Sequence, residues 1–196
     1  MSATAHDPRS PLTHEAYFQL EQHDDWRYEY LAGEVFAMAG GSESHALIAA
    51  NTIGALILTL RGQPCRVYGS DMRLRLDRLD KFCYPDLMVL CEQGRRTPRY
   101  VEAPRLIVEV LSESTESYDR GLKFEHYRTI PELSYYLLLD QTRPHAELFA
   151  RQGTAPIWIL TETTGLDGIV ELSDWGIELA LAELYRDVDL NPKPEN

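Results

Sequence analysis

The chain has 196 residues, of which 44% are hydrophobic and 26% charged, the composition of a globular protein long enough to bury a core. No apolar run approaches the roughly 18 residues that a membrane-spanning helix needs, so a bilayer partner is not expected. The net charge of −12 argues against tight, non-specific binding to duplex DNA, because proteins that neutralise phosphates usually present basic surface. A local basic groove stays open, since arginines cluster at Arg73, Arg75 and Arg78 and again at Arg95, Arg96 and Arg99.

The ends of the chain and its cysteines indicate a cytoplasmic protein. Residues 1–11 are polar and lack the basic start and apolar stretch of a secretory signal. Cys65, Cys83 and Cys91 are an odd, sparse set without CxxC spacing, which predicts reduced, partly buried thiols and no disulfide or zinc framework. We expect one domain over residues 12–188, with flexible tails at 1–11 and 189–196.

A short helix and a hairpin open the predicted order of elements. Thr13 is a good N-cap for a helix that runs to about Gln22. Residues 28–39, "YEYLAGEVFAMA", predict a β-hairpin with its turn near Ala32 and Gly33.

A long helix and three strands follow. Residues 44–61 keep an apolar period near 3.6, and Gly62 ends the predicted helix. Residues 72–76 alternate between apolar and polar, which is typical of a half-buried strand. The runs "CYPDLMVLC" and "RLIVEVLS" are almost continuously apolar, so both are predicted as central strands covered on two faces.

The rest of the chain adds a helix, a strand and a closing strand pair. Ser117 or Asp119 is expected to open a helix that ends before Pro131. "LSYYLLLD" predicts a further central strand, "AELFAR" and "IWILTE" a trailing antiparallel pair, and residues 178–186 a last short helix. The fold class is therefore α/β, a mixed central sheet flanked by helices.

Two acidic residues mark the chemistry of this sheet. Asp86 begins one predicted central strand, and Glu109 lies inside another, on the face of Ile107 and Leu111. A carboxylate in a buried strand is costly to ionise unless a cation or strong donors meet it. On neighbouring strands the two would converge on one hard cation, and oxygen ligands with room for water suit Mg²⁺ or Mn²⁺.

The lysines of the chain point to a third group. Only three of the nineteen basic residues are lysines, and Lys193 lies in a polar tail while Lys81 lies in a charged turn. Lys123 shares a helical stripe with Tyr127 and Ile130 at i, i+4 and i+7, so it should face the sheet. There it could orient an attacking water or stabilise developing charge on phosphate, although a lysine that reaches solvent from the helix edge is the alternative.

Three further residues are possible members of the site. Glu34 could be a third acidic ligand or part of the polar face of the hairpin. His45 begins the long helix, where a structural role is favoured, and Asp71 could flank the site or belong to a turn. A serine nucleophile at Ser112 or Ser114 is not expected, because no His and Asp stand at a suitable spacing.

Four segments in order, "YPDLMVL", "RLIVEVLSEST", "DRGLKFEHYR" and "PELSYYLLLD", resemble the Uma-two family of restriction-endonuclease-like proteins in the PD-(D/E)XK nuclease superfamily. The resemblance covers about residues 13–186. It implies a restriction-endonuclease-like fold that binds Mg²⁺ through Asp86 and Glu109. The superfamily string places a Lys two residues after the Glu, where this chain has Leu111, so the resemblance moves that role to Lys123.

Two functions follow as hypotheses. The first is a Mg²⁺-dependent endonuclease of DNA, with RNA as the less favoured nucleic acid, and a homodimer is possible because such nucleases often pair to cut two strands. The second, motivated by the charge of −12, is a binding or assembly module that keeps the nuclease fold and a vestigial metal site. Hydrolysis of another phosphate ester is a more distant third.

Overall fold

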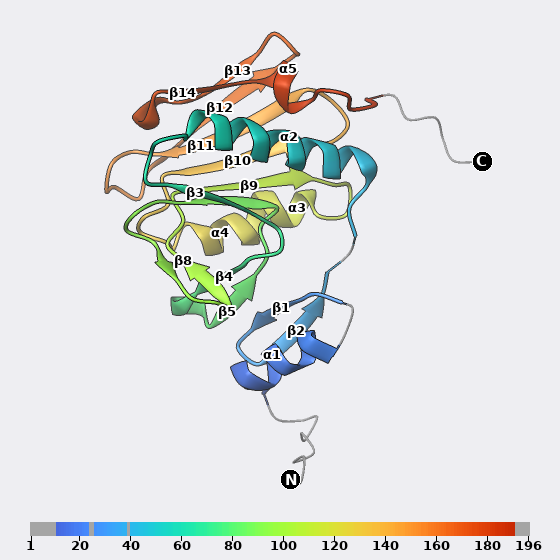
Figure 1. Cartoon of the computed structure of the whole chain (residues 1–196), viewed down its shortest axis with the longest axis vertical. Coiled ribbons are helices and arrows are strands. Elements are labelled where there is room, and N and C mark those ends of the chain that lie inside the picture. The colour runs from blue at the N-terminus through green and yellow to red at the C-terminus, as the bar shows by residue number, and fades with distance from the viewer. Residues whose placement is uncertain (1–10, 24–25, 39, 191–196) are drawn as a thin grey trace, which may run out of the picture.

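The computed structural model describes residues 11–23, 26–38 and 40–190 (Figure 1). Apart from Pro11, Asp189 and Leu190, the predicted flexible tails lie outside the described residues. The helical segments are α1 His14–His23, α2 Glu43–Thr59, η1 Asp77–Leu79, α3 Glu116–Tyr118, η2 Asp119–Lys123, α4 Phe124–Tyr127, η3 Ser173–Trp175 and α5 Leu181–Leu184. The strands are β1 Tyr28–Leu31, β2 Glu34–Ala37, β3 Arg66–Gly69, β4 Arg73–Leu76, β5 Lys81–Cys83, β6 Leu87–Leu90, β7 Arg95–Arg96, β8 Tyr100–Glu102, β9 Leu106–Leu111, β10 Tyr135–Asp140, β11 His145–Arg151, β12 Trp158–Thr164, β13 Ile169–Leu172 and β14 Ile177–Ala180.

The main sheet is mixed, as predicted, with the strand order β12-β11-β10-β9-β6-β3. Strands β9 and β10 are parallel, and the other neighbours are antiparallel. Every residue of β6 and β9 is buried, which is what their continuous apolar sequences predict.

Helices cover both faces of this sheet (Figure 1). On one face, Ile48 and Leu56 of α2 pack against Val108 and Leu137, and the β13–β14 hairpin and α5 extend the same core. On the other face, Phe124 and Tyr127 of α4 pack in a second core that includes Ile107, the face to which Glu109 also belongs. The α/β class with a mixed sheet flanked by helices is therefore confirmed.

A second six-stranded sheet, which the sequence did not predict, has the order β2-β1-β5-β4-β8-β7. The predicted hairpin supplies β1 and β2, and its turn residues Ala32 and Gly33 both have positive φ, 49° and 96°. Tyr17 and Phe18 of α1 pack on this sheet against Tyr30. The segment "CRVYGSDMRLRLD" contributes to both sheets, β3 to the main one and β4 to the second.

The helix predicted between Ser117 and Pro131 is not regular. It consists of α3, the π-helical segment η2 and α4, and Gly121 inside it has non-helical angles, φ −104° and ψ −105°. A glycine tolerates such angles because it has no Cβ. The irregular turn brings Asp119 and Lys123 to the same side of the segment, where both side chains are buried.

Three other predictions are wrong. Residues 178–186 do not form a single helix, because β14 occupies the first part and pairs with β13, and only Leu181–Leu184 is helical. Cys65 and Cys91 form a disulfide, since each flanks one of the paired strands β3 and β6 and the pairing brings them together; Cys83 alone is a free, buried thiol. Lys81 lies in β5, buried, and not in a turn.

No described helix is long and apolar enough to cross a membrane.

Candidate active site

Asp86 and Glu109 meet where β6 and β9 lie side by side. Asp86 immediately precedes β6, which pairs antiparallel with β9, and Leu87 is the partner of Val108 in that ladder. The backbone N–H of Val110 donates to Asp86 Oδ2 over 2.7 Å, and the backbone N–H of Asp86 donates to Glu109 Oε2 over 3.3 Å. The strand pairing thus holds the Asp86 carboxylate against the backbone of β9 and the Glu109 carboxylate against the backbone of Asp86.

The Glu109 side chain is almost fully buried, with 2% of its surface exposed, and donors meet both of its oxygens. Lys123 Nζ lies 2.9 Å from Oε1, and the Tyr127 hydroxyl donates to the same oxygen over 2.8 Å. Burial raises the pKa of Tyr127 well above its usual value of 10, which keeps the phenol protonated as a donor. The predicted stripe of Lys123 and Tyr127 therefore faces Glu109.

Lys123 is shared between two carboxylates. Its Nζ also lies 3.0 Å from Asp119 Oδ1, one helical turn earlier, and the Tyr136 hydroxyl donates to the backbone carbonyl of Asp119 over 3.0 Å. The hydrogen bond from Tyr136 anchors η2 to β10. Asp119 is thus a buried member of the cluster, although the sequence indicated it as a possible start of the helix.

Charge in this cluster is tightly coupled. Burial raises the pKa of Glu109 to about 8, with Asp86 and Asp119 adding to the effect and Lys123 opposing it. Burial alone would lower the pKa of Lys123, but Glu109 and Asp119 more than offset this and raise it well above 10.5. We conclude that Lys123 is the charged member of the pair, and that Glu109 retains a proton more readily than an exposed carboxyl.

His45 belongs to the same site. Its Nε2 lies 3.1 Å from Asp86 Oδ2, and Ser42 caps the helix that carries it by accepting from the His45 backbone N–H. The hydrogen bond to Asp86 raises the pKa of His45, although burial opposes that rise. The sequence favoured a structural histidine here, and the contact with Asp86 gives it a place beside the candidate metal ligand.

The structure does not bring Glu34 or Asp71 to this cluster. Glu34 is exposed on β2, and Asp71 is an exposed turn residue paired with Arg27. Glu29 of β1 comes closer, because its charge helps to raise the pKa of Lys123, and its Oε2 lies 3.0 Å from Lys81 Nζ. Sequence alone could not choose between Glu29 and Glu34, since the two sit on one short hairpin and only the packing on β5 distinguishes them.

The carboxylate oxygens of Asp86 and Glu109 are suitable ligands for a hard divalent cation. Carboxylate oxygens are the ligands that Mg²⁺ prefers, and Mg²⁺ usually keeps several waters. Among the described residues Asp86 Oδ1 accepts no hydrogen bond, and its side chain is 17% exposed, so one oxygen and a route for water are open.

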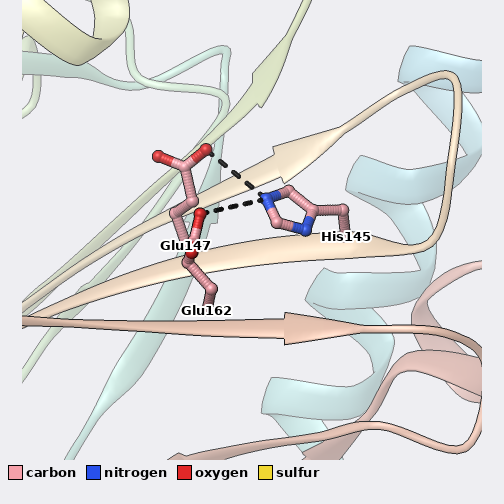
Figure 2. Close-up of side chains that lie close together, drawn as sticks. All are labelled: His145, Glu147 and Glu162. Carbon is pink, nitrogen blue, oxygen red and sulfur yellow. Dashed lines mark ion pairs between the residues drawn. The ribbon is translucent and has the colours of Figure 1, made fainter.

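A different group meets a stricter geometric criterion. Within the part of the chain that the structure describes, one set of three His, Cys, Asp or Glu side chains has ligand atoms that all lie within 4.8 Å of one another. It consists of His145, Glu147 and Glu162 (Figure 2). They stand on β11 and β12, and β10 separates these strands from β9, which carries Glu109. The chain therefore has a possible metal-binding cluster that the sequence did not single out.

The fold that carries these buried acids and the lysine is restriction-endonuclease-like. A solved structure described as "a putative nuclease belonging to DUF820 from Anabaena variabilis ATCC 29413" shares the fold, with a TM-score of 0.65 and 15% identity over 81% of this chain and 89% of that one. The chain belongs to the Uma2 family, described as "Putative restriction endonuclease", which it matches over residues 14–182.

Two relatives come from Synechocystis sp. (strain ATCC 27184 / PCC 6803 / Kazusa). "Uncharacterized protein slr1290" is 33% identical over 186 residues, which are 93% of this chain and 97% of the relative. "Uncharacterized protein sll1609" is 36% identical over 165 residues, which are 83% of this chain and 93% of the relative. The family resemblance seen in the sequence motifs is confirmed.

Proposed function

We propose that this protein is a Mg²⁺- or Mn²⁺-dependent endonuclease of the PD-(D/E)XK type that hydrolyses phosphodiester bonds in DNA. Asp86 and Glu109 are the metal ligands and Lys123 is the catalytic cation. The observation that carries the proposal is the 2.9 Å contact between Lys123 Nζ and Glu109 Oε1, in a family described as restriction endonucleases. This contact supports the assignment of the catalytic lysine to Lys123, since the strand position two residues after Glu109 is occupied by Leu111.

Each residue has a chemical role in this proposal. A bound Mg²⁺ supplies Lewis-acid stabilisation and a water of lowered pKa. Lys123 holds its ammonium beside the reacting phosphate, where it stabilises developing negative charge, and Asp119 keeps it in place. Tyr127 orients the Glu109 carboxylate, and His45 orients that of Asp86.

The test is nicking of supercoiled plasmid by the purified full-length chain in the presence of Mg²⁺ or Mn²⁺. We expect Lys123→Met and Glu109→Gln to lower the rate at least a hundredfold, since the first removes the cation that stabilises the reacting phosphate and the second removes a metal ligand. Lys81→Met is the matched control, because Lys81 is also buried and paired with a glutamate, Glu29, at 3.0 Å. Equal losses in Lys81→Met and Lys123→Met would trace the effect to lost stability and contradict the assignment.

One observation favours the second candidate, a binding or assembly module without catalysis. The arginine clusters that could form a basic groove are largely paired with acids: Arg73 with Glu21, Arg75 with Asp77 and Glu102, Arg95 with Glu102, and Arg99 with Glu15. Little free positive charge remains there to hold phosphates. If wild type nicks no DNA or RNA with either metal ion, this module becomes the function to pursue.

The remaining proposals concern assembly and location. A homodimer would present two sites to the two strands of a duplex, and sedimentation of the wild-type chain with and without DNA tests this. A cytoplasmic location is the setting in which such an enzyme meets DNA.

A further inference from the structure

We propose that His145, Glu147 and Glu162 bind a transition-metal ion such as Zn²⁺, in a site separate from Asp86 and Glu109 (Figure 2). The proposal does not depend on nuclease activity. It starts from the strand pattern: His145 and Glu147 are two residues apart on β11, so their side chains share one face of the sheet. Glu162 of β12 is the direct cross-strand partner of Glu147.

Two glutamates directly opposite on neighbouring strands repel each other, and a positive charge between them relieves that repulsion. Part of it comes from Arg120, whose Nε donates to Glu147 Oε1 and Oε2 over 3.0 and 3.1 Å. The Glu162 side chain is 63% exposed, and among the described residues its ion-pair partner is His145 Nε2 at 3.8 Å. A cation between the two carboxylates would complete the compensation.

The distances fit metal ligands better than hydrogen bonds. His145 Nε2 lies 3.6 Å from Glu147 Oε1 and 3.8 Å from Glu162 Oε1, beyond hydrogen-bond range for both pairs. Two ligand atoms that are each about 2.1 Å from a tetrahedral Zn²⁺ lie about 3.4 Å apart. The two distances from His145 therefore exceed this spacing by only a few tenths of an ångström, and the ligand oxygens of the two glutamates lie within 4.8 Å of each other.

The imidazole of His145 is an independent indication. Its side chain is only 8% exposed, and among the described residues no hydrogen bond reaches its Nε2. On the other side of the ring, Nδ1 lies 3.0 Å from the Thr164 hydroxyl. An imidazole that donates its Nδ1–H to that hydroxyl carries its lone pair on Nε2, directed at the two carboxylates, as metal-binding histidines do.

The ligand set selects the kind of ion. One imidazole with two carboxylates suits Zn²⁺, and also Mn²⁺, Co²⁺ or Ni²⁺, better than Mg²⁺. The exposed Glu162 leaves an open side for water. Arg120 weakens the site by its positive charge, but a carboxylate has about four lone-pair positions, so Glu147 can serve the guanidinium and the ion together.

The experiment uses the full-length Glu109→Gln variant, in which the other candidate ligand pair is disabled. Zn²⁺ titrated by calorimetry should bind with a stoichiometry of one, and Co²⁺ should give the visible absorption of a nitrogen-containing site. Adding Glu162→Gln, an exposed change that spares the core, or His145→Ala should weaken Zn²⁺ binding at least tenfold. A large excess of Mg²⁺ should not displace the ion.

The matched control is Glu178→Gln. Glu178 of β14 and Glu171 of β13 are also direct cross-strand partners, but no histidine stands in their ladder. This change should leave Zn²⁺ binding unaltered. The proposal is overturned if Zn²⁺ fails to bind the Glu109→Gln variant, or if Glu178→Gln weakens binding as much as Glu162→Gln. Neither result depends on whether wild type cuts DNA.

Discussion

Both lysines that the structure describes are buried, and each is paired with a glutamate. Lys123 lies against Glu109, and Lys81, with 2% of its side chain exposed, lies 3.0 Å from Glu29. Removing one partner of a buried pair is destabilising by about 3–5 kcal/mol, because the other charge is left without compensation. Glu109 escapes part of this cost, since its pKa of about 8 allows it to be neutral near pH 7.

The difference between the lysines gives a stability prediction. Lys123→Met should lower the free energy of unfolding by less than Lys81→Met at pH 7, because Glu109 can take up a proton once its partner is lost. Urea unfolding of both variants and wild type measures this. A larger loss in Lys123→Met would mean that Glu109 stays ionised in the variant.

His126 gives a prediction about pH. Burial lowers the pKa of His126 below 6.5, and the nearby Lys81 lowers it further. As the pH falls, the unfolded chain therefore takes up a proton at His126 before the folded one does. The contribution of His126 to the free energy of unfolding is fully present above about pH 6.5 and is lost as the pH falls through the pKa of the folded state. Urea unfolding between pH 5 and 7 should show a shallower decline in His126→Gln than in wild type, and parallel curves would contradict the assignment.

At the scale of elements, the hairpin turn is suboptimal. Both turn residues have positive φ, and Ala32, at 49°, lacks the short polar side chain that makes left-handed angles more favourable. We expect Ala32→Asn to raise the free energy of unfolding by about 0.5–1 kcal/mol, because asparagine tolerates left-handed angles. Ala32→Val should lower it, since a branched side chain does not. Thermal unfolding of the pair tests the turn, and a stabilising Val would contradict it.

The elements that sequence predicted are those with one dominant signal. The strands β6, β9 and β10 are continuous apolar runs, and α2 has a long helical period. The elements that the sequence did not predict are short or depend on distant partners. Strand β3 has four residues, none of them buried, and β14 overlaps the segment that was predicted as a helix, although it pairs with β13. The π turn at Gly121 has no signal in the local sequence apart from the glycine itself.

The candidate site was predictable in part. Buried carboxylates in apolar strands and a lysine on an apolar stripe indicated Asp86, Glu109 and Lys123, and the structure brings the three together. The contacts of His45 and Asp119 come from tertiary packing, which spacing along the chain does not encode. His145 and Glu162 were missed because the pairing register of β11 with β12 is what places them together.

At the scale of the whole molecule, the disulfide restrains the unfolded chain. Cys65 and Cys91 are separated by 26 residues, and closing a loop of that size stabilises the folded state by about 3–4 kcal/mol in the chain-entropy account. We expect Cys65→Ala to lower the free energy of unfolding by about that amount under oxidising conditions. A reducing agent should bring wild type to the same value and leave the variant unchanged; a wild type that ignores the reductant would contradict this.

The path of the chain alternates between the two large sheets. It passes from β2 to β3, back to β4 and β5, on to β6, back to β7 and β8, and then to β9. During synthesis, neither sheet can therefore be finished from one contiguous stretch of nascent chain. Glu109 leaves the ribosome before Lys123 does, so its carboxyl is sequestered with its cationic partner only after the following segment has emerged. Strands β10, β11 and β12 emerge later still, so a chain released before Lys123 would lack both the cation of the cluster and half of the main sheet.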